Sequence, residues 1–351
     1  MQREAISLEA VAAHENLLRA TWKAARAKHD RPDVVRFLTD LDVRLRTLAQ
    51  DILLQRVPSG RARRFVIHDP KRRVITAACF VDRVLHHAIL NLAEARFERM
   101  LVDSCYACRP DRGVHTAVMA VQKHLRRWPW FVQVDVESYF PSIDHARLKL
   151  LLARRFKGAG FLSLLGRIID AGAADTPGRG LPIGALTSQH FANAYLDVAD
   201  RWLLEHPAVY GHVRYMDDIV WWCESRSEAV TILDALRDLL WEERGLRLKP
   251  SVHVGRSEHG LAYCGFRVKP GVVLASSRKL SRYRAGLLRL WSMDAGKSAT
   301  AWQIQRAHDG LLAALAGAET LGFRRRLWTS SGASDNTRSD NYHPAPGCGS
   351  I

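Results

Sequence analysis

The chain has 351 residues, of which 47% are hydrophobic and 25% charged, and its formal net charge is +16. This length indicates two or three modules around a sizeable core, and the charge indicates a polyanion, above all nucleic acid, as partner. No apolar run approaches the roughly 18 residues of a membrane span, and the start MQREAISLEA has no signal-peptide core. We therefore expect a cytoplasmic protein without a membrane partner.

Apolar periodicity predicts a helical lead-in over residues 6–56, interrupted by Pro32. The stretch RRFVIHDPKRRVITA predicts a hairpin with its turn at 69–72. Helices are then expected over 80–101 and 114–125. WFVQVDVESYF predicts a strand that ends near Asp135.

The second half alternates helices and short strands. Helices are expected over 146–170, 185–206, 227–244 and about 278–327. Further strand candidates are GHVRY, IVWWC, HGLAYCGFRV and GVVLAS.

Cysteine usage gives little support for a structural metal. Of the six cysteines, only Cys105 and Cys108 have C-x-x-C spacing. A structural zinc site needs four ligands, and no second pair stands at a plausible distance. Reduced thiols in a reducing compartment are the favoured interpretation.

Three carboxylates are expected at one edge of a sheet. Asp135 ends one strand, and Asp217 and Asp218 follow the strand HVRY in a hairpin turn. Such a cluster repels itself unless divalent cations neutralise it, and hard oxygen ligands suit Mg²⁺. Two metal ions can stabilise the attacking and leaving oxygens of a phosphoryl transfer. Asp-Asp is also ordinary turn chemistry, which is the alternative.

Y-x-D-D between apolar strands, after an earlier strand that ends in Asp and an aromatic pair, resembles the palm of a reverse transcriptase. Further blocks follow in the expected order: DPKRRVITAACFVDRVLHHAI, YACRPDRGVHTAV, VDVESYFPSIDH, GLPIGALTSQHFANAYLDVADR and YCGFRV. The resemblance covers about residues 60–325. It implies an α+β right-hand polymerase with fingers, a palm built on an antiparallel sheet with helices, and a helical thumb.

The resemblance also implies domain limits. They are 1–60 for an N-terminal helical extension, 61–130 for the fingers with 145–180 as fingers and palm helices, 131–144 and 181–268 for the palm, 269–328 for the thumb, and 329–351 for a tail that its composition predicts to be disordered.

Within the superfamily, LPIGALTSQHFAN and YACRPDRG look most like reverse transcriptases of diversity-generating retroelements, which are related to those of group II introns, retrons and abortive infection. These enzymes copy a template-repeat RNA with errors at adenines. Many reverse transcriptases have Gln where this chain has Ile183, and an aliphatic residue there is associated with adenine infidelity. Simple packing of Ile183 is the alternative. Other open readings are a defence-associated reverse transcriptase, a retron-like or group II-like one, and a non-catalytic RNA-binding protein.

The resemblance implies roles for individual residues. Asp135, Asp217 and Asp218 would be catalytic and, with the Val136 carbonyl, would hold two Mg²⁺ ions, for which Mn²⁺ can substitute. Phe140 would be the steric gate against ribose. The other residues expected to bind nucleotide are Lys71, Arg73, Ile183 and Gln189, and those expected to bind nucleic acid are Arg109, Arg278, Lys279, Arg282 and Arg289.

Purely structural roles are the alternatives for most of these residues. Phe140 can be a core aromatic, the basic turn and the basic helix face can be solvated, Arg109 can support its loop, and Thr187 or Ser188 can cap a helix beside Gln189. The chain departs from the family pattern at one lysine. The pattern has a Lys after the second palm helix, and Lys249 stands a few residues before that position. The resemblance implies that this lysine protonates the departing pyrophosphate, and Lys249, His253 or solvent could do so here. The implied partners are template RNA, cDNA or primer, dNTPs, and a small basic helical accessory protein that forms a pentamer.

Overall fold

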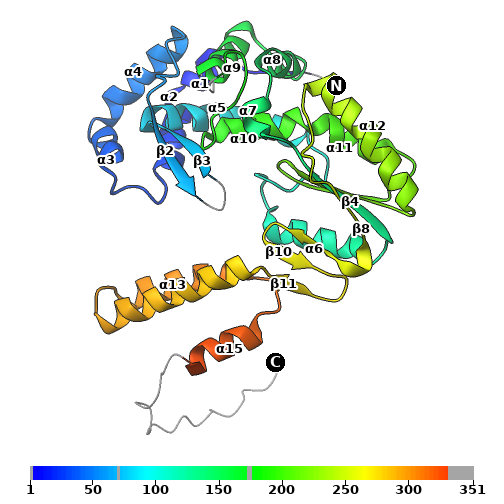
Figure 1. The fold of residues 1–351 in the computed structure, drawn as a ribbon. Coiled ribbons are helices and arrows are strands. Elements are labelled where there is room, and N and C mark those ends of the chain that lie inside the picture. The colour runs from blue at the N-terminus through cyan, green and yellow to red at the C-terminus, as the bar shows by residue number, and fades with distance from the viewer. Residues whose placement is uncertain (1–2, 69–71, 172–175, 331–351) are drawn as a thin grey trace, which may run out of the picture. The chain divides into compact units, whose positions relative to one another are not determined.

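The computed structural model describes residues 3–68, 72–171 and 176–330. The chain divides into two compact units, Met1–Gly260 and Leu261–Ile351. Helices and an antiparallel sheet occur together (Figure 1), so the predicted α+β class is confirmed. Within the described ranges, no helix has the length and apolarity needed to cross a membrane. Lys71 and most of the predicted tail lie outside the described residues.

The helical lead-in is confirmed as four helices. Ser7 caps the first by accepting a hydrogen bond from Ala10 N at 3.1 Å, and Pro32 opens the third, where its missing N–H is not needed. Leu17 and Ala20 are fully buried, on the second helix, which packs along α5. The four helices are α1 (Leu8–Ala12), α2 (His14–Ala25), α3 (Pro32–Thr39) and α4 (Leu41–Leu53), and α5 (Phe80–Glu98) is the helix expected over 80–101.

The predicted hairpin and the helix over 114–125 are also confirmed. Strands β2 (Ala62–His68) and β3 (Arg72–Ala78) pair antiparallel in full register, and their side chains are largely exposed. Helix α6 (Val114–Leu125) keeps its predicted bounds.

A four-stranded antiparallel sheet lies at the centre of the first unit, in the order β6-β7-β4-β8. One face packs Val132, Val134 and Trp221 into the main core, with α12 (Arg226–Arg244) against it. On the other, α6 covers β6, and its His124 stacks on Trp222 with ring centroids 4.8 Å apart. The strands are β4 (Trp130–Asp135), β6 (Gly211–Tyr215), β7 (Asp218–Cys223) and β8 (His253–Arg256), of which β8 was not expected.

The prediction of one helix over 146–170 is wrong, because a short strand within this segment pairs with a strand at the start of the chain. Helices α8 (His145–Ala153) and α9 (Ala159–Ala171) flank β5 (Phe156–Lys157), which pairs parallel with β1 (Glu4–Ala5). Gly158 turns the chain there with φ 110°, and a Cβ on it would lie 2.6 Å from the Ile6 carbonyl oxygen. Only glycine fits this approach.

The helix expected over 185–206 is divided as well, into α10 (Leu186–Tyr195) and α11 (Asp197–Glu205). The carbonyl of Tyr195 accepts a hydrogen bond from Arg244 Nε at 2.8 Å, while Ala199 N donates to Leu196. The helical hydrogen-bond ladder therefore breaks at this point. An arginine 49 residues away supplies the replacement.

Over residues 261–330, which the structure describes, the C-terminal unit has a three-stranded antiparallel sheet and three helices. HGLAYCGFRV was expected to be one strand, but Cys264 (φ 48°) and Gly265 (φ 78°) form a tight turn within it. Tyr283, Leu287 and Leu315 form its small core. The elements are β9 (Leu261–Tyr263), β10 (Phe266–Val268), β11 (Val273–Ala275), α13 (Ser277–Ala295), α14 (Ala301–Ala313) and α15 (Leu321–Ser330).

Candidate active site

The structure brings the three predicted carboxylates together at one edge of the central sheet. Asp135 ends β4 and is the direct cross-strand partner of Asp218, which begins β7. Asp217 lies in the turn between β6 and β7, and its carbonyl oxygen accepts a hydrogen bond from Val136 N at 3.3 Å. The turn is tight, because only Met216 and Asp217 separate Tyr215 from Asp218.

The turn contains a backbone conformation that side chains disfavour. Met216 has φ 56°, in the left-handed region. Such a conformation costs on the order of 1–3 kcal/mol in a non-glycine residue and persists only where the surroundings impose it. The residue directly before Asp217 is therefore held in place by its neighbours.

Asp217 and Asp218 resist ionisation, because the pKa of each is raised. Burial, and then repulsion by Asp135, raise the pKa of Asp217. Burial raises the pKa of Asp218 to about 7, with repulsion by the other two carboxylates adding to it, although Gln133 Nε2 donates to its two oxygens at 3.0 and 3.2 Å. The surrounding protein groups therefore do not fully offset the negative charge that Asp217 and Asp218 carry when ionised.

One cation of the chain lies within the cluster. Lys249 Nζ forms an ion pair with Asp135 Oδ1, and Lys249 N donates to the Asp135 carbonyl at 2.9 Å. The lysine that the sequence places early along the chain is therefore in contact with a predicted metal ligand. Its role in catalysis stays a prediction, as does that of His253.

The donor chemistry of this edge fits a divalent cation, since Asp135 and Asp217 offer hard carboxylate oxygens and share excess negative charge. The arrangement is not a preformed cage. Among residues 3–68, 72–171 and 176–330, no group of three or more His, Cys, Asp or Glu is placed to hold a metal ion. Lys249 and Gln133 instead engage Asp135 and Asp218.

Phe140 lies one short turn beyond the carboxylates. Helix α7 (Tyr139–Ser142) follows Ser138, and Phe140 is half-buried while Tyr139 is buried and donates to the carbonyl of Ala192. The Phe140 carbonyl accepts from Leu181 N at 2.9 Å, which ties α7 to the loop before α10. Phe140 also packs against the main core, and its role as steric gate stays a prediction.

Ile183 and Arg73 belong to connected segments. The carbonyl of Ile183 accepts a hydrogen bond from Thr76 N of β3 at 2.9 Å. A Cβ on Gly184 would lie 3.2 Å from both Ile75 Cγ2 and the Thr76 oxygen, so the two segments are in close contact. Arg73 is exposed on the same hairpin. Nucleotide binding by these residues stays a prediction.

Gln189 is half-buried near the start of α10, and its Oε1 accepts from Cys108 Sγ at 3.4 Å. The capping alternative for its neighbours is wrong, because the N-cap residue is Ala185 and has no side-chain cap. Thr187 and Ser188 are buried instead, and Thr187 Oγ1 lies 2.9 Å from His86 Nδ1.

Arg109 is buried and bonded to its own surroundings. Its guanidinium pairs with Glu98 at 2.7 Å and donates to the carbonyls of Val102 and Cys105 at 2.6 and 2.8 Å. These bonds give Arg109 a structural role in the loop. A nucleic-acid contact by the same side chain stays a prediction.

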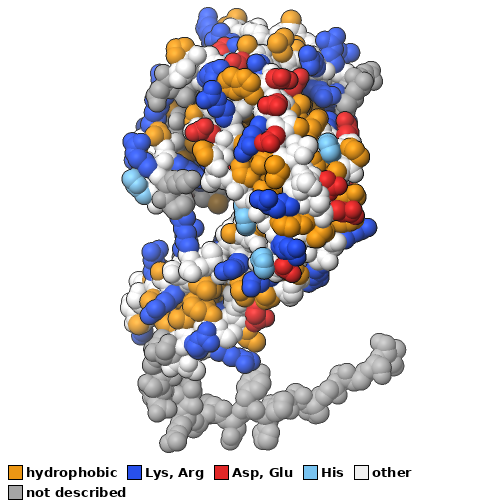
Figure 2. Space-filling view, turned by 45° about the vertical axis from the view of Figure 1, so that its right-hand side comes forward, with side chains coloured by type: hydrophobic (Ala, Val, Ile, Leu, Met, Phe, Trp, Pro, Cys, Tyr) orange, Lys and Arg blue, Asp and Glu red, His pale blue; other side chains and the backbone are white. Residues whose placement is uncertain are grey.

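The remaining predicted cations lie on α13 of the C-terminal unit. Lys279 Nζ lies 4.1 Å from the Phe266 ring centroid and donates to the Ala314 carbonyl at 3.1 Å, so its charge already has partners. Arg278, Arg282 and Arg289 follow along the helix. Figure 2 shows Lys and Arg interleaved with hydrophobic side chains on the visible face of this unit. Nucleic-acid binding by these four residues stays a prediction.

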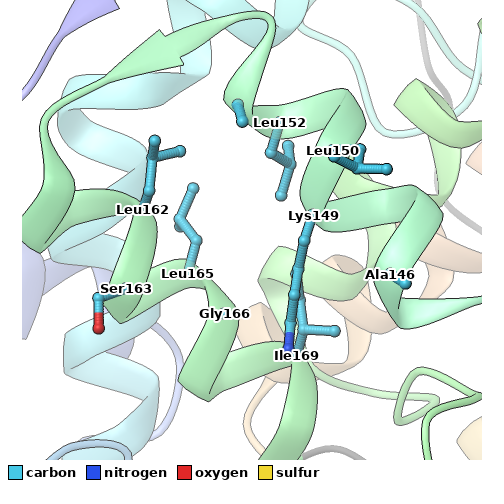
Figure 3. A pocket seen from close by; sticks show the side chains of 10 residues that line it. Ala146, Lys149, Leu150, Leu152, Leu162, Ser163, Leu165, Gly166 and Ile169 are labelled. Atoms are coloured by element: carbon cyan, nitrogen blue, oxygen red, sulfur yellow. The ribbon is translucent and has the colours of Figure 1, made fainter.

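A pocket of about 460 Å³ lies between α8 and α9 (Figure 3), lined mainly by aliphatic side chains such as Leu150, Leu162 and Leu165. Lys149 borders it, and its ammonium pairs with Asp170 at 2.7 Å. None of the predicted site residues lines this pocket.

Residues that the motifs did not single out also build the site. The sequence motifs predict neither a contact of Gln133 with Asp218 nor a role for Arg214 in the site. Arg214 is completely buried beneath the turn. An arginine within an otherwise apolar strand was the available signal, since a buried charge needs partners.

Known proteins similar to this chain match parts of it. It is 30% identical to protein YkfC of Escherichia coli (strain K12) over 47% of this chain and 46% of that protein. It is 27% identical to the group II intron-encoded protein LtrA of Lactococcus lactis subsp. cremoris over 38% of this chain and 23% of that protein. The chain thus matches less than half the length of these relatives.

Among solved structures, the telomerase of Candida tropicalis in complex with a fragment of telomeric RNA matches 77% of this chain and 55% of its own, at 10% identity and a TM-score of 0.48. That similarity carries no conclusion about function.

The family comparison covers the fold and the site together. A model of the reverse transcriptase (RNA-dependent DNA polymerase) family matches residues 68–268, which is more than half of the chain and includes β3, α10 and the three carboxylates. The antiparallel sheet and its helices are accordingly those of a right-hand polymerase, as predicted. The chain belongs to the reverse transcriptase family.

Proposed function

We propose that this protein is an RNA-directed DNA polymerase that adds deoxynucleotides to a primer along an RNA template. The observation that carries the proposal is the meeting of Asp135, Asp217 and Asp218 at one edge of the sheet. RNA binding alone does not require clustered negative charge, and a polyanion would be repelled by it. A non-catalytic RNA-binding role is therefore disfavoured.

Asp135 and Asp217 would hold two Mg²⁺ ions, with Asp218 and the Val136 carbonyl completing the set, and Mn²⁺ would substitute. The ions supply charge stabilisation for the attacking and leaving oxygens of the phosphoryl transfer. The chain's own contribution is to fix the carboxylates on paired strands. Phe140, beside them, would exclude the ribose 2′-hydroxyl.

The proposed division of labour follows the predicted segments. Residues 61–130 would act as fingers, 131–144 and 181–268 as palm, and 269–328 as thumb. From Arg267, near the end of the palm segment, to Arg326 the chain has twelve Lys or Arg against three Asp or Glu. This excess suits non-specific contacts to template and product backbones.

We further propose that the enzyme serves a diversity-generating retroelement and makes cDNA with errors at template adenines. Ile183 in LPIGALTSQHFAN supports this, because an aliphatic side chain cannot supply the amide contact of the Gln common at this position. A pentameric basic accessory protein would be its partner. The similarity to the group II intron-encoded protein LtrA favours a group II-like reverse transcriptase as the second candidate.

Primer extension tests the polymerase proposal. The purified protein, an RNA template with an annealed DNA primer and dNTPs should give extension that depends on Mg²⁺ and stops with EDTA. Asp135→Asn should abolish it. Extension that survives chelation, or that Asp135→Asn leaves unchanged, would exclude the proposed role of the carboxylates. A gene neighbourhood with paired repeats that differ at adenines would separate the two candidate biological roles.

A further inference from the structure

The side chain of Arg214, on β6, is a fully satisfied buried cation. Its relative exposure is 0%, and each of its five N–H groups has an acceptor, the full donor capacity of a guanidinium. The acceptors are Asp200 Oδ1 and Oδ2, both at 2.6 Å, Asn193 Oδ1 at 3.2 Å and the Asn193 carbonyl at 3.1 Å, and the Met216 carbonyl at 3.0 Å.

These bonds join β6 to the two helices before it and to the turn after it, all within residues 193–216. Asn193 is on α10, Asp200 is on α11, and Met216 is in the turn next to Asp217. Each partner is a side chain or carbonyl of a different element. One guanidinium therefore connects the turn to both helices.

The backbone of Arg214 is also hydrogen-bonded to the loop before α6. Arg214 N donates to the Ser104 carbonyl at 2.9 Å, and Tyr106 N donates to the Arg214 carbonyl at 2.9 Å. Asn193 Nδ2 donates to the Ala107 carbonyl at 2.7 Å. The loop over 104–107, α10, α11 and the turn thus share one network of hydrogen bonds.

A buried ion pair between Asp200 and Arg214 stabilises this network. Asp200 is fully buried, which opposes its ionisation, yet Arg214 and His212 hold the pKa of Asp200 down at about 2. Asp200 and Arg214 are therefore a buried ion pair with every guanidinium donor used. Such a fully bonded pair adds rigidity and direction to the elements that it joins.

The bond to the Met216 carbonyl is the one that reaches the carboxylates. Met216 holds the unfavourable φ of 56°, and its carbonyl is fixed by Arg214 on one side of the turn while the Asp217 carbonyl is fixed by Val136 N on the other. Relaxation of Met216 to an ordinary conformation would shift the backbone of the turn in which Asp217 is the next residue. The fork of Arg214 opposes that movement.

We propose that Arg214 is a positioning residue that holds the Met216–Asp217 turn in the geometry in which Asp135 and Asp217 bind a divalent cation. The inference rests on the proposed function for its biological meaning. Lysine cannot replace the arginine, because a single ammonium has no planar fork to reach Asp200, Asn193 and the Met216 carbonyl together. The charge alone is thus not sufficient.

Binding of Mn²⁺ alone, followed by electron paramagnetic resonance without nucleic acid, tests this inference. Arg214→Lys keeps the charge and should weaken Mn²⁺ binding about tenfold, the range found for residues that orient metal ligands. Arg201→Lys is the matched control, because Arg201 pairs with Asp197 on α11 at 2.7 Å and donates to the Met100 carbonyl. It should bind Mn²⁺ like the wild type.

Equal Mn²⁺ affinity in folded Arg214→Lys and in the wild type would overturn the inference. Circular dichroism reports folding, and if Arg214→Lys does not fold, Asn193→Ala replaces it. This second variant keeps the ion pair and removes one acceptor, so its Mn²⁺ affinity should fall by a smaller factor. Unchanged affinity there would equally contradict the inference. An Arg214 effect on Mn²⁺ in a protein that extends no primer would refute the proposed function alone.

Discussion

Asp135 of β4 and Asp218 of β7 are directly opposed across two hydrogen-bonded strands. Directly opposed like charges destabilise a sheet, and Asp217 directly precedes Asp218 in the adjoining turn. In the absence of a metal, repulsion among the carboxylates at this edge of the sheet therefore lowers the stability of the fold. Substitution of these aspartates should therefore raise the stability of the metal-free protein and lower its activity.

Asp218→Asn should stabilise the metal-free protein in a pH-dependent manner. The raised pKa of about 7 means that the folded state retains a proton which an unfolded Asp loses near pH 4. The free energy of unfolding of the wild type therefore falls as pH rises from about 4 to about 7. At pH 8 in EDTA the variant should be more stable by about 2 kcal/mol, after discounting for partial exposure.

Denaturant unfolding at pH 4 and pH 8 measures this difference. Asp238→Asn is the control, because Asp238 is exposed on α12 and far along the sequence from the turn. The stabilisation by Asp218→Asn should be small at pH 4 and grow with pH. The same stabilisation at both pH values would contradict the assigned cause.

Phe140→Ala should increase the use of ribonucleotides relative to deoxyribonucleotides by at least about tenfold, because the half-buried ring would no longer occupy the space of a 2′-hydroxyl. Competition between the two nucleotide types in primer extension measures the ratio. Tyr139→Phe removes only a buried hydroxyl that donates to Ala192. That control should lower stability without changing the ratio, and a ratio unaffected by Phe140→Ala would assign the ring to the core.

Ile183→Gln should lower the error frequency at template adenines, since an amide would restore a polar contact near the incoming nucleotide. Sequencing of cDNA made on one RNA template measures the frequency for each template base. Ile183→Val keeps the aliphatic character, and the Thr76 bond to the Ile183 carbonyl does not depend on the side chain. An unchanged spectrum in Ile183→Gln would leave Ile183 as a packing residue.

Arg289→Gln should weaken nucleic-acid binding and reduce its salt dependence. Arg289 is exposed on α13, so loss of one phosphate contact should lower the slope of log affinity against log salt by about 1. Arg237→Gln is the control, because Arg237 is in a surface ion pair with Asp234. Titration of a template–primer duplex at several salt concentrations gives both slopes, and equal slopes would place Arg289 outside the interface.

Local patterns predicted much of the fold. Helix α6 has the predicted bounds because two local signals define it, namely its start after Gly113 and the helical spacing of its apolar residues. The hairpin of β2 and β3 and the strand that ends at Asp135 follow for the same reason. Breaks within predicted helices were missed where a distant partner causes them, as at Gly158 beside Ile6.

The site was predictable only in part. The spacing of Asp135, Asp217 and Asp218 in strand-like segments indicated that they would meet, and the register brings them together. The contact of Lys249 with Asp135 could not be predicted, since it depends on how residues 247–249 return to the end of β4. The same holds for Arg214, whose acceptors come from α10, α11 and the turn.

The central claim is that the clustered carboxylates support RNA-templated DNA synthesis. Primer extension on an RNA template with Mg²⁺ and dNTPs, comparing the wild type, Asp217→Asn and the surface control Asp238→Asn, tests it most directly. We expect extension by the wild type and the control, and a loss of about 100-fold or more in Asp217→Asn. Extension by Asp217→Asn at the wild-type rate, in a preparation free of other polymerases, would contradict the account.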